Sequence, residues 1–186
     1  MGPIWLVDFE DSFTYNIAAE FEALGRPVEV IPWRSLTVPA QSRPALLVLG
    51  PGPGHPDEYP IEEILLAWWK SGVPLGGICL GHQLIARFLG LPVIRSVLPA
   101  HGEAFVWRVP PKWRKQYSLP TFVEVQRYNS LAVPARALPK GWSGWEESGE
   151  WVAFSHARAL SFQFHPESVG TSCPRQFFLP LCELAL

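Results

Sequence analysis

Short apolar runs alternate with amphipathic segments over the first ninety residues, and this alternation strongly constrains the fold. Three apolar runs have the length of buried strands, 4–7, 44–50 and 73–78, and residues 27–31 are a further extended segment. Three helices are predicted between and after them, each ending at a glycine: 11–25, 58–72 and 81–90. This order predicts an α/β fold whose parallel sheet carries helices on both faces.

After Pro92 the pattern changes to short β-branched or aromatic segments that are separated by turn residues. Five such segments follow: 102–110, 121–128, 140–147, 150–156 and 159–165. We expect them to be antiparallel strands added to the parallel core in the C-terminal half. Residues 174–186 are predicted to form a closing helix. Because no repeat or linker interrupts the chain, we expect a single domain over residues 1–186.

Composition excludes several classes of partner. The formal net charge of −2 and the pI near 6.2 give no basic footprint for nucleic acid. No run approaches the ~18 consecutive apolar residues of a membrane span, so we expect no membrane association. The three cysteines are scattered, which argues against both a disulfide framework and a structural zinc site. We therefore expect a reduced, cytoplasmic protein.

Cys79 lies at the turn between a predicted strand and a predicted helix. The spacing G-x-C-x-G, with Gly77 and Gly81 as neighbours, is that of a nucleophile elbow, whose central residue adopts a sparsely populated backbone conformation. The helix start also places unpaired N–H groups beside the sulfur, which favours the thiolate. The alternative is a cysteine that only fills space, and this is what we expect of Cys173 and Cys182.

A cysteine nucleophile needs a base, and His165 is the strongest candidate among the five histidines. His165 and Glu167 are separated by Pro166, and residues i and i+2 of an extended chain project to the same side. Glu167 could then fix the tautomer and orientation of the imidazole, as the acid of a catalytic triad does. His82 is expected to point away from Cys79. The alternative for residues 165–167 is a surface turn.

A glycine-rich loop, GPGPGHP at residues 50–56, directly follows a predicted strand. Its glycines let backbone amides approach a ligand closely, and its prolines hold the loop in one shape. Both properties suit an oxyanion hole, whose donors must be in place before charge develops. The loop lacks the pattern of a dinucleotide-binding loop or a P-loop. Taken alone, the loop is more typical of a rigid turn than of a functional site.

Three sequence blocks occur together and in one order: PGPGHP at 51–56, GICLGHQ at 77–83 and FQFHPES at 162–168. In this combination the chain resembles the class I, triad-type glutamine amidotransferases. VDFEDSFTYNI at 7–17 and RYNSL at 127–131 are similar to the glutaminase subunits of anthranilate synthase and aminodeoxychorismate synthase. The resemblance covers nearly the whole chain. It implies an open, mostly parallel twisted sheet of the flavodoxin-like amidotransferase architecture.

The resemblance implies a catalytic role for three residues. Cys79 attacks the side-chain amide of glutamine. His165, oriented by Glu167, protonates the departing ammonia and later activates the water that releases glutamate.

The resemblance also implies an oxyanion hole and a glutamine-binding site. The oxyanion hole consists of the backbone amides of Gly52 and Leu80. Glutamine is held by four residues: Gly52, Gln83, Ser130 and Leu131. Ammonia then passes to a separate chorismate-using synthase subunit of tryptophan or folate biosynthesis. No metal or organic cofactor is implied for this subunit, whereas magnesium is expected in the partner synthase.

Two positions depart from the pattern of the resembled family. The family usually has Tyr-His-Ser-Leu where this chain has Asn129 as the second residue of the block. It commonly has His-Gly-Lys where this chain has Glu103 as the third residue. Both segments are expected near the rim that faces the partner, so these departures bear on partner identity and activation rather than on catalysis.

Three other functions stay open at this stage. One is a glutaminase that serves another acceptor synthetase, although the DSFTYN block weighs against it. Another is a regulatory subunit of the same fold without turnover, against which the intact Cys79, His165 and Glu167 argue. The third is cysteine-dependent hydrolysis of a different amide or ester. Ammonia release from glutamine, with and without a chorismate-binding partner, discriminates among them.

Overall fold

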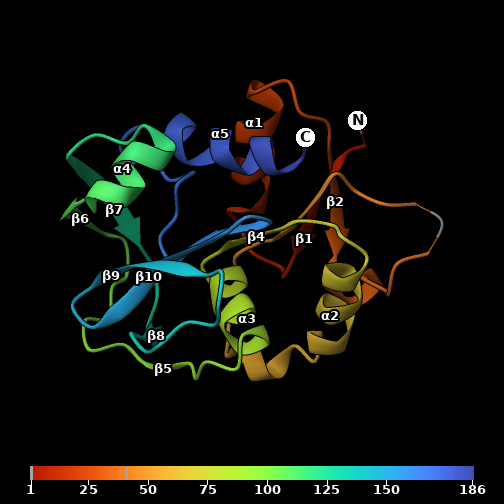
Figure 1. The fold of residues 1–186 in the computed structure, drawn as a ribbon, viewed down its shortest axis with the longest axis horizontal. Coiled ribbons are helices and arrows are strands. Elements are labelled where there is room, and N and C mark those ends of the chain that lie inside the picture. The colour runs from red at the N-terminus through yellow and green to blue at the C-terminus, as the bar shows by residue number, and fades with distance from the viewer. Residues whose placement is uncertain (1, 41) are drawn as a thin grey trace.

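The computed structural model describes residues 2–40 and 42–186 and contains a mixed sheet covered by helices on both faces (Figure 1). Half of this sheet consists of parallel strands in the order β2-β1-β3-β4-β11. These are β1 (Ile4–Asp8), β2 (Val28–Pro32), β3 (Leu46–Leu49), β4 (Leu75–Ile78) and β11 (Ala159–Phe162). The order matches the doubly wound, flavodoxin-like arrangement with β11 in the fifth place, which confirms the predicted fold class.

Two pairs of helices cover the two faces of the parallel strands (Figure 1). On one face lie α1 (Thr14–Ala23) and α5 (Pro174–Leu184), and on the other lie α2 (Glu62–Lys70) and α3 (Leu80–Phe88). The packing of β3 explains why its sequence is continuously apolar. Leu46 and Val48 pack with the first pair of helices, whereas Leu47 and Leu49 pack with the second. A strand that is buried on both faces has no polar side to present.

The helix ends were predicted correctly from glycine. Gly25, Gly72 and Gly90 follow α1, α2 and α3 and have φ of +73°, +90° and +75°. This left-handed conformation favours glycine, because it has no Cβ. The predicted start of the first helix was wrong, since Phe13 is the N-cap and no side chain caps the helix. The Asp11 carboxylate instead accepts a hydrogen bond from Phe13 N at 2.8 Å and forms a turn before the helix.

The other half of the main sheet is antiparallel, as predicted for residues 140–147 and 150–156. β10 (Glu150–His156) pairs with β11, with β9 (Ser143–Glu147) and with β8 (Leu131–Pro134), and β8 pairs with β5 (Ile94–Arg95). β11 itself joins the two halves, because it runs parallel to β4 and antiparallel to β10. The prediction that residues 159–165 belong only to the antiparallel addition was therefore wrong. All four residues of β11 are buried, as a central strand requires.

Two further segments depart from the predicted arrangement. β6 (Glu103–Arg108) and β7 (Phe122–Arg127) pair with each other as a separate two-stranded sheet, and do not extend the main one. This two-stranded sheet has one buried face, since Val123 and Val125 are buried whereas Val106 is exposed. The sequence analysis missed α4 (Pro111–Tyr117), which begins at a proline and buries Trp113. Two short 3-10 helices complete the described elements: η1 (Trp33–Ser35) and η2 (Pro56–Glu58).

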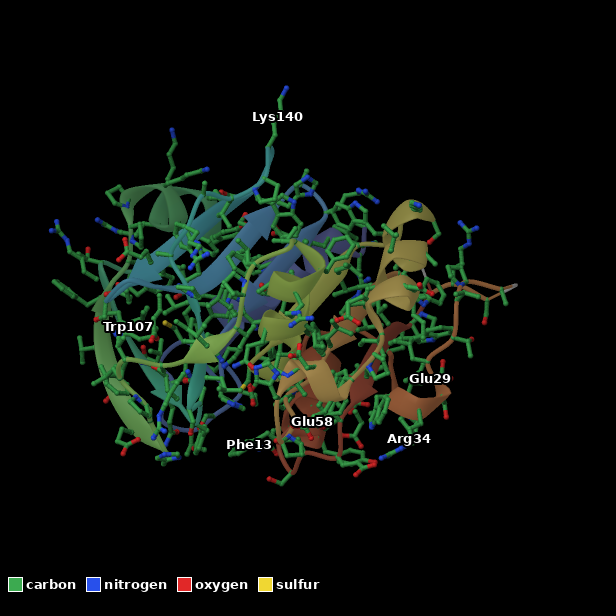
Figure 2. The ribbon with its side chains drawn as sticks, turned by 90° about the horizontal axis from the view of Figure 1, so that it is seen from below. Phe13, Glu29, Arg34, Glu58, Trp107 and Lys140 are labelled. Atoms are coloured by element: carbon green, nitrogen blue, oxygen red, sulfur yellow. The ribbon has the colours of Figure 1, made fainter. Side chains whose placement is uncertain are left out.

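The loops that follow β1 and β3 meet at one edge of the molecule. Phe13 and Glu58 mark the ends of these loops, and they lie at the same end of the molecule in Figure 2, far from Lys140. The carboxyl ends of parallel strands converge at such an edge, where doubly wound proteins bind their ligands. Within the described part of the chain, no helix is long and apolar enough to cross a membrane.

Replacement of Phe178 tests the packing of α5 on the sheet. Its ring is fully buried and meets Phe21 of α1 edge to face, with 5.0 Å between the ring centroids. We expect Phe178→Ala to lower the free energy of unfolding by about 3–5 kcal/mol, because it leaves a cavity between α1 and α5. The neighbouring Leu179 is exposed, so Leu179→Ala should cost less than about 1 kcal/mol. Urea unfolding compares the two, and equal losses would contradict this packing.

Candidate active site

Cys79 lies at the junction of β4 and α3 in a strained backbone conformation. It is the N-cap of α3, with φ +53° and ψ −104°. Two hydrogen bonds fix the turn: Cys79 N donates to Phe162 O at 2.8 Å, and Gly81 N donates to Gly50 O at 3.1 Å. Such a conformation costs on the order of 1–3 kcal/mol and persists only when its surroundings hold it in place.

The two glycines beside Cys79 are required by close backbone approach. A Cβ on Gly77 would lie 2.7 Å from the carbonyl oxygen of Gly81, and a Cβ on Gly81 would overlap the carbonyl group of Leu49. Neither backbone group can move away without breaking the sheet or the helix. The spacing G-x-C-x-G therefore has a steric basis, because no Cβ fits at either flanking position.

His165 and Glu167 form a buried pair beside Cys79. His165 Nδ1 and Glu167 Oε1 are 2.6 Å apart, and both side chains are almost fully buried. Burial alone would lower the pKa of His165, but the adjacent Cys79 and Glu167 outweigh it and hold that pKa well above its ordinary value. His165 Nε2 is buried and has no regular hydrogen-bond partner. This nitrogen is therefore the one that is free to exchange a proton with the thiol.

Two aromatic rings hold the imidazole of His165 in place. The ring of Tyr128 meets it edge to face at 5.0 Å, and the ring of Phe13 lies 5.2 Å away. The backbone of His165 is also fixed, because its N–H donates to Gln126 O at 3.0 Å and its carbonyl accepts from Thr171 Oγ1 at 2.6 Å. The histidine is thus oriented by packing as well as by Glu167.

The loop after β1 explains part of the DSFTYN block. The Asp8 carboxylate accepts hydrogen bonds from Glu10 N at 2.9 Å and from Thr14 Oγ1 at 2.8 Å. Together with the Asp11–Phe13 turn, these bonds close the loop and direct Phe13 toward His165. Sequence reasoning used this block only for the resemblance, and it missed the contact between Phe13 and the histidine.

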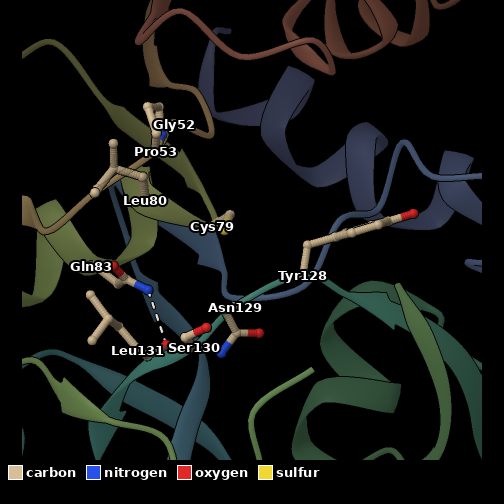
Figure 3. A pocket seen from close by; sticks show the side chains of 10 residues that line it. Gly52, Pro53, Cys79, Leu80, Gln83, Tyr128, Asn129, Ser130 and Leu131 are labelled. Carbon is tan, nitrogen blue, oxygen red and sulfur yellow. Dashed lines mark hydrogen bonds between the residues drawn. The ribbon is translucent and has the colours of Figure 1, made fainter. Parts of the chain in front are cut away.

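A cavity of about 180 Å³ opens at Cys79 (Figure 3). The loop after β3 and the start of α3 form one wall, and residues 128–131 form the facing wall. The cavity brings together seven of the predicted or flagged residues: Gly52, Cys79, Leu80, Gln83, Asn129, Ser130 and Leu131. The predicted glutamine-binding residues therefore share one cavity with the thiol.

Gly52 and Leu80 lie side by side at this cavity, because a Cβ on Gly52 would be 2.6 Å from Leu80 Cδ2. In the described part of the chain, the amide of Gly52 donates to no other backbone group. Leu80 is the first residue of α3, so its amide has no acceptor within the helix. Both amides are thus available to an oxyanion. Tyr59 stiffens the loop, since its hydroxyl donates to Pro53 O at 2.9 Å.

Gln83 spans the gap between α3 and the facing wall. Its Nε2 donates to Leu131 O at 3.1 Å, which Figure 3 shows as a dashed line, and to Gln163 Oε1 at 3.1 Å. Asn129, one of the two departures, donates from Nδ2 to the same Leu131 oxygen at 2.9 Å. The Leu131 carbonyl is thus held from two sides.

A buried ion pair supports this wall, and sequence reasoning missed it. Arg127 Nη2 and Glu150 Oε2 are 3.5 Å apart, and both side chains are almost fully buried. Arg127 Nε also donates to Asn129 Oδ1 at 3.0 Å. Burial lowers the pKa of Arg127, and Glu150 opposes that shift. Ser96 Oγ and Val97 N both donate to Glu150 Oε1 at 2.8 Å, which further compensates the buried charge.

Glu103, the other departure, is exposed on β6 and accepts a hydrogen bond from His101 N. This bond, with that of its own backbone N–H, lowers the pKa of the Glu103 carboxyl. Glu103 therefore closes the turn before β6. Among residues 2–40 and 42–186, no group of three or more His, Cys, Asp or Glu residues is placed to hold a metal ion.

His82 points away from Cys79, as predicted. His82 Nδ1 lies 3.0 Å from Ser161 Oγ, its Nε2 lies 3.0 Å from Trp151 O, and its ring stacks on Phe154. Burial lowers the pKa of His82 from 6.5 to about 3. A neutral histidine that links α3 to β10 and β11 serves the core rather than the reaction.

The sequence matches the family of class I glutamine amidotransferases over residues 5–179. The chain belongs to this family. The match spans most of the chain and includes the elements that carry Cys79, His165 and Glu167. The resemblance stated from the sequence blocks is confirmed, and the protein is an enzyme of the amidotransferase class.

Individual relatives agree with the family match. Anthranilate synthase component 2 of Azospirillum brasilense is 40% identical over 173 residues, which cover 88% of this amidotransferase and 87% of the relative. Aminodeoxychorismate/anthranilate synthase component 2 of Bacillus subtilis is 33% identical over 175 residues, which cover 91% of this chain and 90% of the relative. A crystal structure of a glutamine amidotransferase from Methylobacillus flagellatus has the same fold, with a TM-score of 0.71 and 21% identity. The superposition covers 90% of this chain and 71% of that one.

The neutral state of His82 predicts a pH dependence of stability. Because its pKa is near 3 when folded and 6.5 when unfolded, the unfolded chain binds the proton more tightly. This contribution is complete above about pH 6.5 and falls as the pH decreases toward 3. From neutral pH to pH 5 the loss amounts to about 2 kcal/mol. Urea unfolding at several pH values should show this loss of unfolding free energy in the unmodified protein but not in His82→Gln. The same pH dependence in both proteins would contradict the conclusion that His82 is buried in its neutral form.

Proposed function

We propose that this amidotransferase is the glutaminase subunit of a chorismate-using synthase, and that it supplies ammonia by hydrolysing glutamine. The observation that carries the proposal is the strained Cys79 turn beside the buried His165–Glu167 pair. All three residues lie at the carboxyl end of the parallel sheet, and the thiol opens into the cavity. This arrangement combines a nucleophile, a base and an orienting acid, which acyl transfer from an amide requires.

In the first half of the reaction, Cys79 Sγ attacks the side-chain amide carbon of glutamine. His165 Nε2 takes the thiol proton, and Glu167 stabilises the resulting imidazolium through the 2.6 Å contact with Nδ1. The negative charge that develops on the amide oxygen is met by the N–H groups of Gly52 and Leu80. His165 then gives its proton to the departing nitrogen, the C–N bond breaks, and ammonia leaves a glutamyl thioester on Cys79.

In the second half, the same groups act on water. His165 Nε2 takes a proton from a water molecule as its oxygen attacks the thioester carbon. The same two amides hold the oxyanion, the C–S bond breaks, and the proton returns to the sulfur. Glutamate leaves, and the Cys79 thiol is restored. The cycle consumes water and glutamine, and it needs no electron donor or acceptor.

Glutamine is held in the cavity by the two facing walls. Ser130 and Leu131 offer their main chain from one side, and Gly52 offers its amide from the other. Ser130 O accepts from Ser96 N and Leu131 O accepts from Gln83, so the wall is rigid before the substrate arrives. A preformed wall limits the entropy that binding costs.

The relatives support a chorismate-using partner. Both of those described above are named as component 2 of an anthranilate or aminodeoxychorismate synthase, and each is covered along most of its length. We infer a component I subunit that receives the ammonia and makes anthranilate, aminodeoxychorismate or both, in tryptophan or folate biosynthesis. Magnesium belongs to that partner in this proposal, and the present chain works without metal or organic cofactor. Its cysteines are free thiols, which fits a cytoplasmic location.

The direct test of this function is replacement of Cys79 in the complex with a chorismate-using subunit. We expect Cys79→Ala to lower glutamine-dependent product formation by about 10³-fold or more, because the nucleophile is gone. Synthesis from free ammonia should stay within about twofold of the unmodified complex. The matched control is Cys173→Ala, which changes a cysteine outside the cavity and should leave both rates unchanged.

Three outcomes would contradict the proposal. Glutamine-dependent activity that survives in Cys79→Ala would remove the thiol from the reaction. Loss of the ammonia-dependent activity as well would assign Cys79 to the structure of the complex. Negligible ammonia release from glutamine by the unmodified protein, with and without the partner, would instead favour a regulatory subunit.

A further inference from the structure

Gln163 is a buried side chain next to the thiol that the reaction described above does not use. It lies between the end of β11 and His165, is only 1% exposed, and its backbone N–H donates to Val152 O at 2.9 Å. Its side-chain Nε2 donates to Cys79 Sγ at 3.8 Å, and its Oε1 accepts from Gln83 Nε2 at 3.1 Å. One amide group thus touches both the nucleophile and a residue of the cavity wall.

We propose that Gln163 is a further catalytic residue of this site, which donates a hydrogen bond to the Cys79 sulfur and fixes the direction in which Gln83 faces glutamine. This inference deepens the proposed glutaminase function and rests on it. Gln163 touches a reacting atom, the sulfur, and it acts on the substrate only through Gln83.

The orientation of the side-chain amides near Gln163 is fixed by two neighbours. One is a guanidinium that can only donate hydrogen bonds, and the other is a carbonyl that can only accept them. The Arg127 guanidinium can only donate, so the Asn129 atom that it meets at 3.0 Å must be the oxygen. The Asn129 nitrogen then faces the Leu131 carbonyl, which can only accept. The same carbonyl requires that Gln83 present its nitrogen at 3.1 Å.

The orientation of Gln163 follows from that of Gln83. Because Gln83 Nε2 also meets Gln163, the Gln163 atom at this contact must be the acceptor oxygen. The Gln163 nitrogen is thereby directed at the sulfur. The direction of donation reverses at the Leu131 carbonyl, which accepts from both Asn129 and Gln83. From Gln83 Nε2 onward the two bonds run in one direction, through Gln163 to the Cys79 sulfur, and bonds in such a series strengthen one another in a low dielectric.

Two consequences follow for the reaction. An N–H group beside the sulfur stabilises the thiolate more than the thiol, because a hydrogen bond to a charged acceptor is stronger than one to a neutral acceptor. Both hydrogens of Gln83 Nε2 are already engaged, by Leu131 O and by Gln163 Oε1. Gln83 therefore offers only its oxygen to the cavity, where it accepts a hydrogen bond from a donor group of glutamine.

Two variants of Gln163 separate these effects. Gln163→Glu keeps an acceptor for Gln83 but removes the donor from the sulfur, whereas Gln163→Met removes both. Gln176→Met is the matched control, because it makes the same change on α5, away from the cavity. The readout that does not depend on turnover is the pH profile of alkylation of Cys79 by iodoacetamide, followed on the peptide that contains this residue. The second readout is the kcat and KM of glutamine hydrolysis.

We expect Gln163→Met to raise the midpoint of the alkylation profile by about one pH unit, as loss of one hydrogen bond to a thiolate implies. Gln163→Glu should raise it further, because its carboxylate also brings a negative charge close to the thiolate. In Gln163→Glu, kcat should fall about tenfold while KM stays within about threefold. In Gln163→Met, KM should rise as well, because Gln83 is released. Gln176→Met should match the unmodified protein in every measurement.

An unshifted alkylation midpoint in folded Gln163→Glu and Gln163→Met would overturn the inference. Loss of the folded state in both variants, judged by circular dichroism, would assign Gln163 to the core and overturn it too. The alkylation profile distinguishes this failure from failure of the proposed function. If the unmodified protein releases no ammonia from glutamine, the function fails, whatever the midpoint of the variants.

Discussion

The backbone of Cys79 is held at a positive φ by the pairing of two parallel strands, and the rest of the site depends on that pairing. Cys79 N donates to Phe162 O, the last residue of β11, and the register continues the pairing of Phe162 with Ile78. Because His165 follows Phe162 closely in the chain, the bond that fixes the thiol also places the imidazole beside it. Gln163 directly follows the same strand. Nucleophile, base and a donor to the sulfur are thus positioned by one register.

Much of the parallel core could be predicted from the sequence because its signals are local. Glycine marks the end of each of the first three helices, and the apolar run of β3 is typical of a strand buried on both faces. The antiparallel half was harder to predict, because short aromatic segments do not reveal which strand they join. β11 resembles the antiparallel strands in composition, yet it pairs with β4 of the parallel core. β6 and β7 form a two-stranded sheet that is separate from the main one.

The site was predictable where a local spacing determines it and not elsewhere. The Glu167 carboxylate meets His165 across a turn, which the bond from Ser168 N to His165 O closes, and not along an extended chain as predicted. His55 and Asp57 have the same spacing and lie 3.4 Å apart on the surface. Only the fold decides which pair adjoins a thiol. The Arg127–Glu150 ion pair and the contacts of Gln163 connect segments far apart in the chain, so no local pattern indicates them. Phe13 lies within a recognised block, yet its contact with His165 is tertiary.

The central claim is that Cys79 forms a covalent glutamyl intermediate while His165 and Glu167 support it. The most direct measurement is acid quenching of the protein during turnover with glutamine, followed by mass spectrometry of its peptides. The account predicts a glutamyl thioester on the peptide that contains Cys79, and none on the peptides of Cys173 and Cys182. Steady release of ammonia with no adduct on Cys79, or with the adduct on another cysteine, would contradict it.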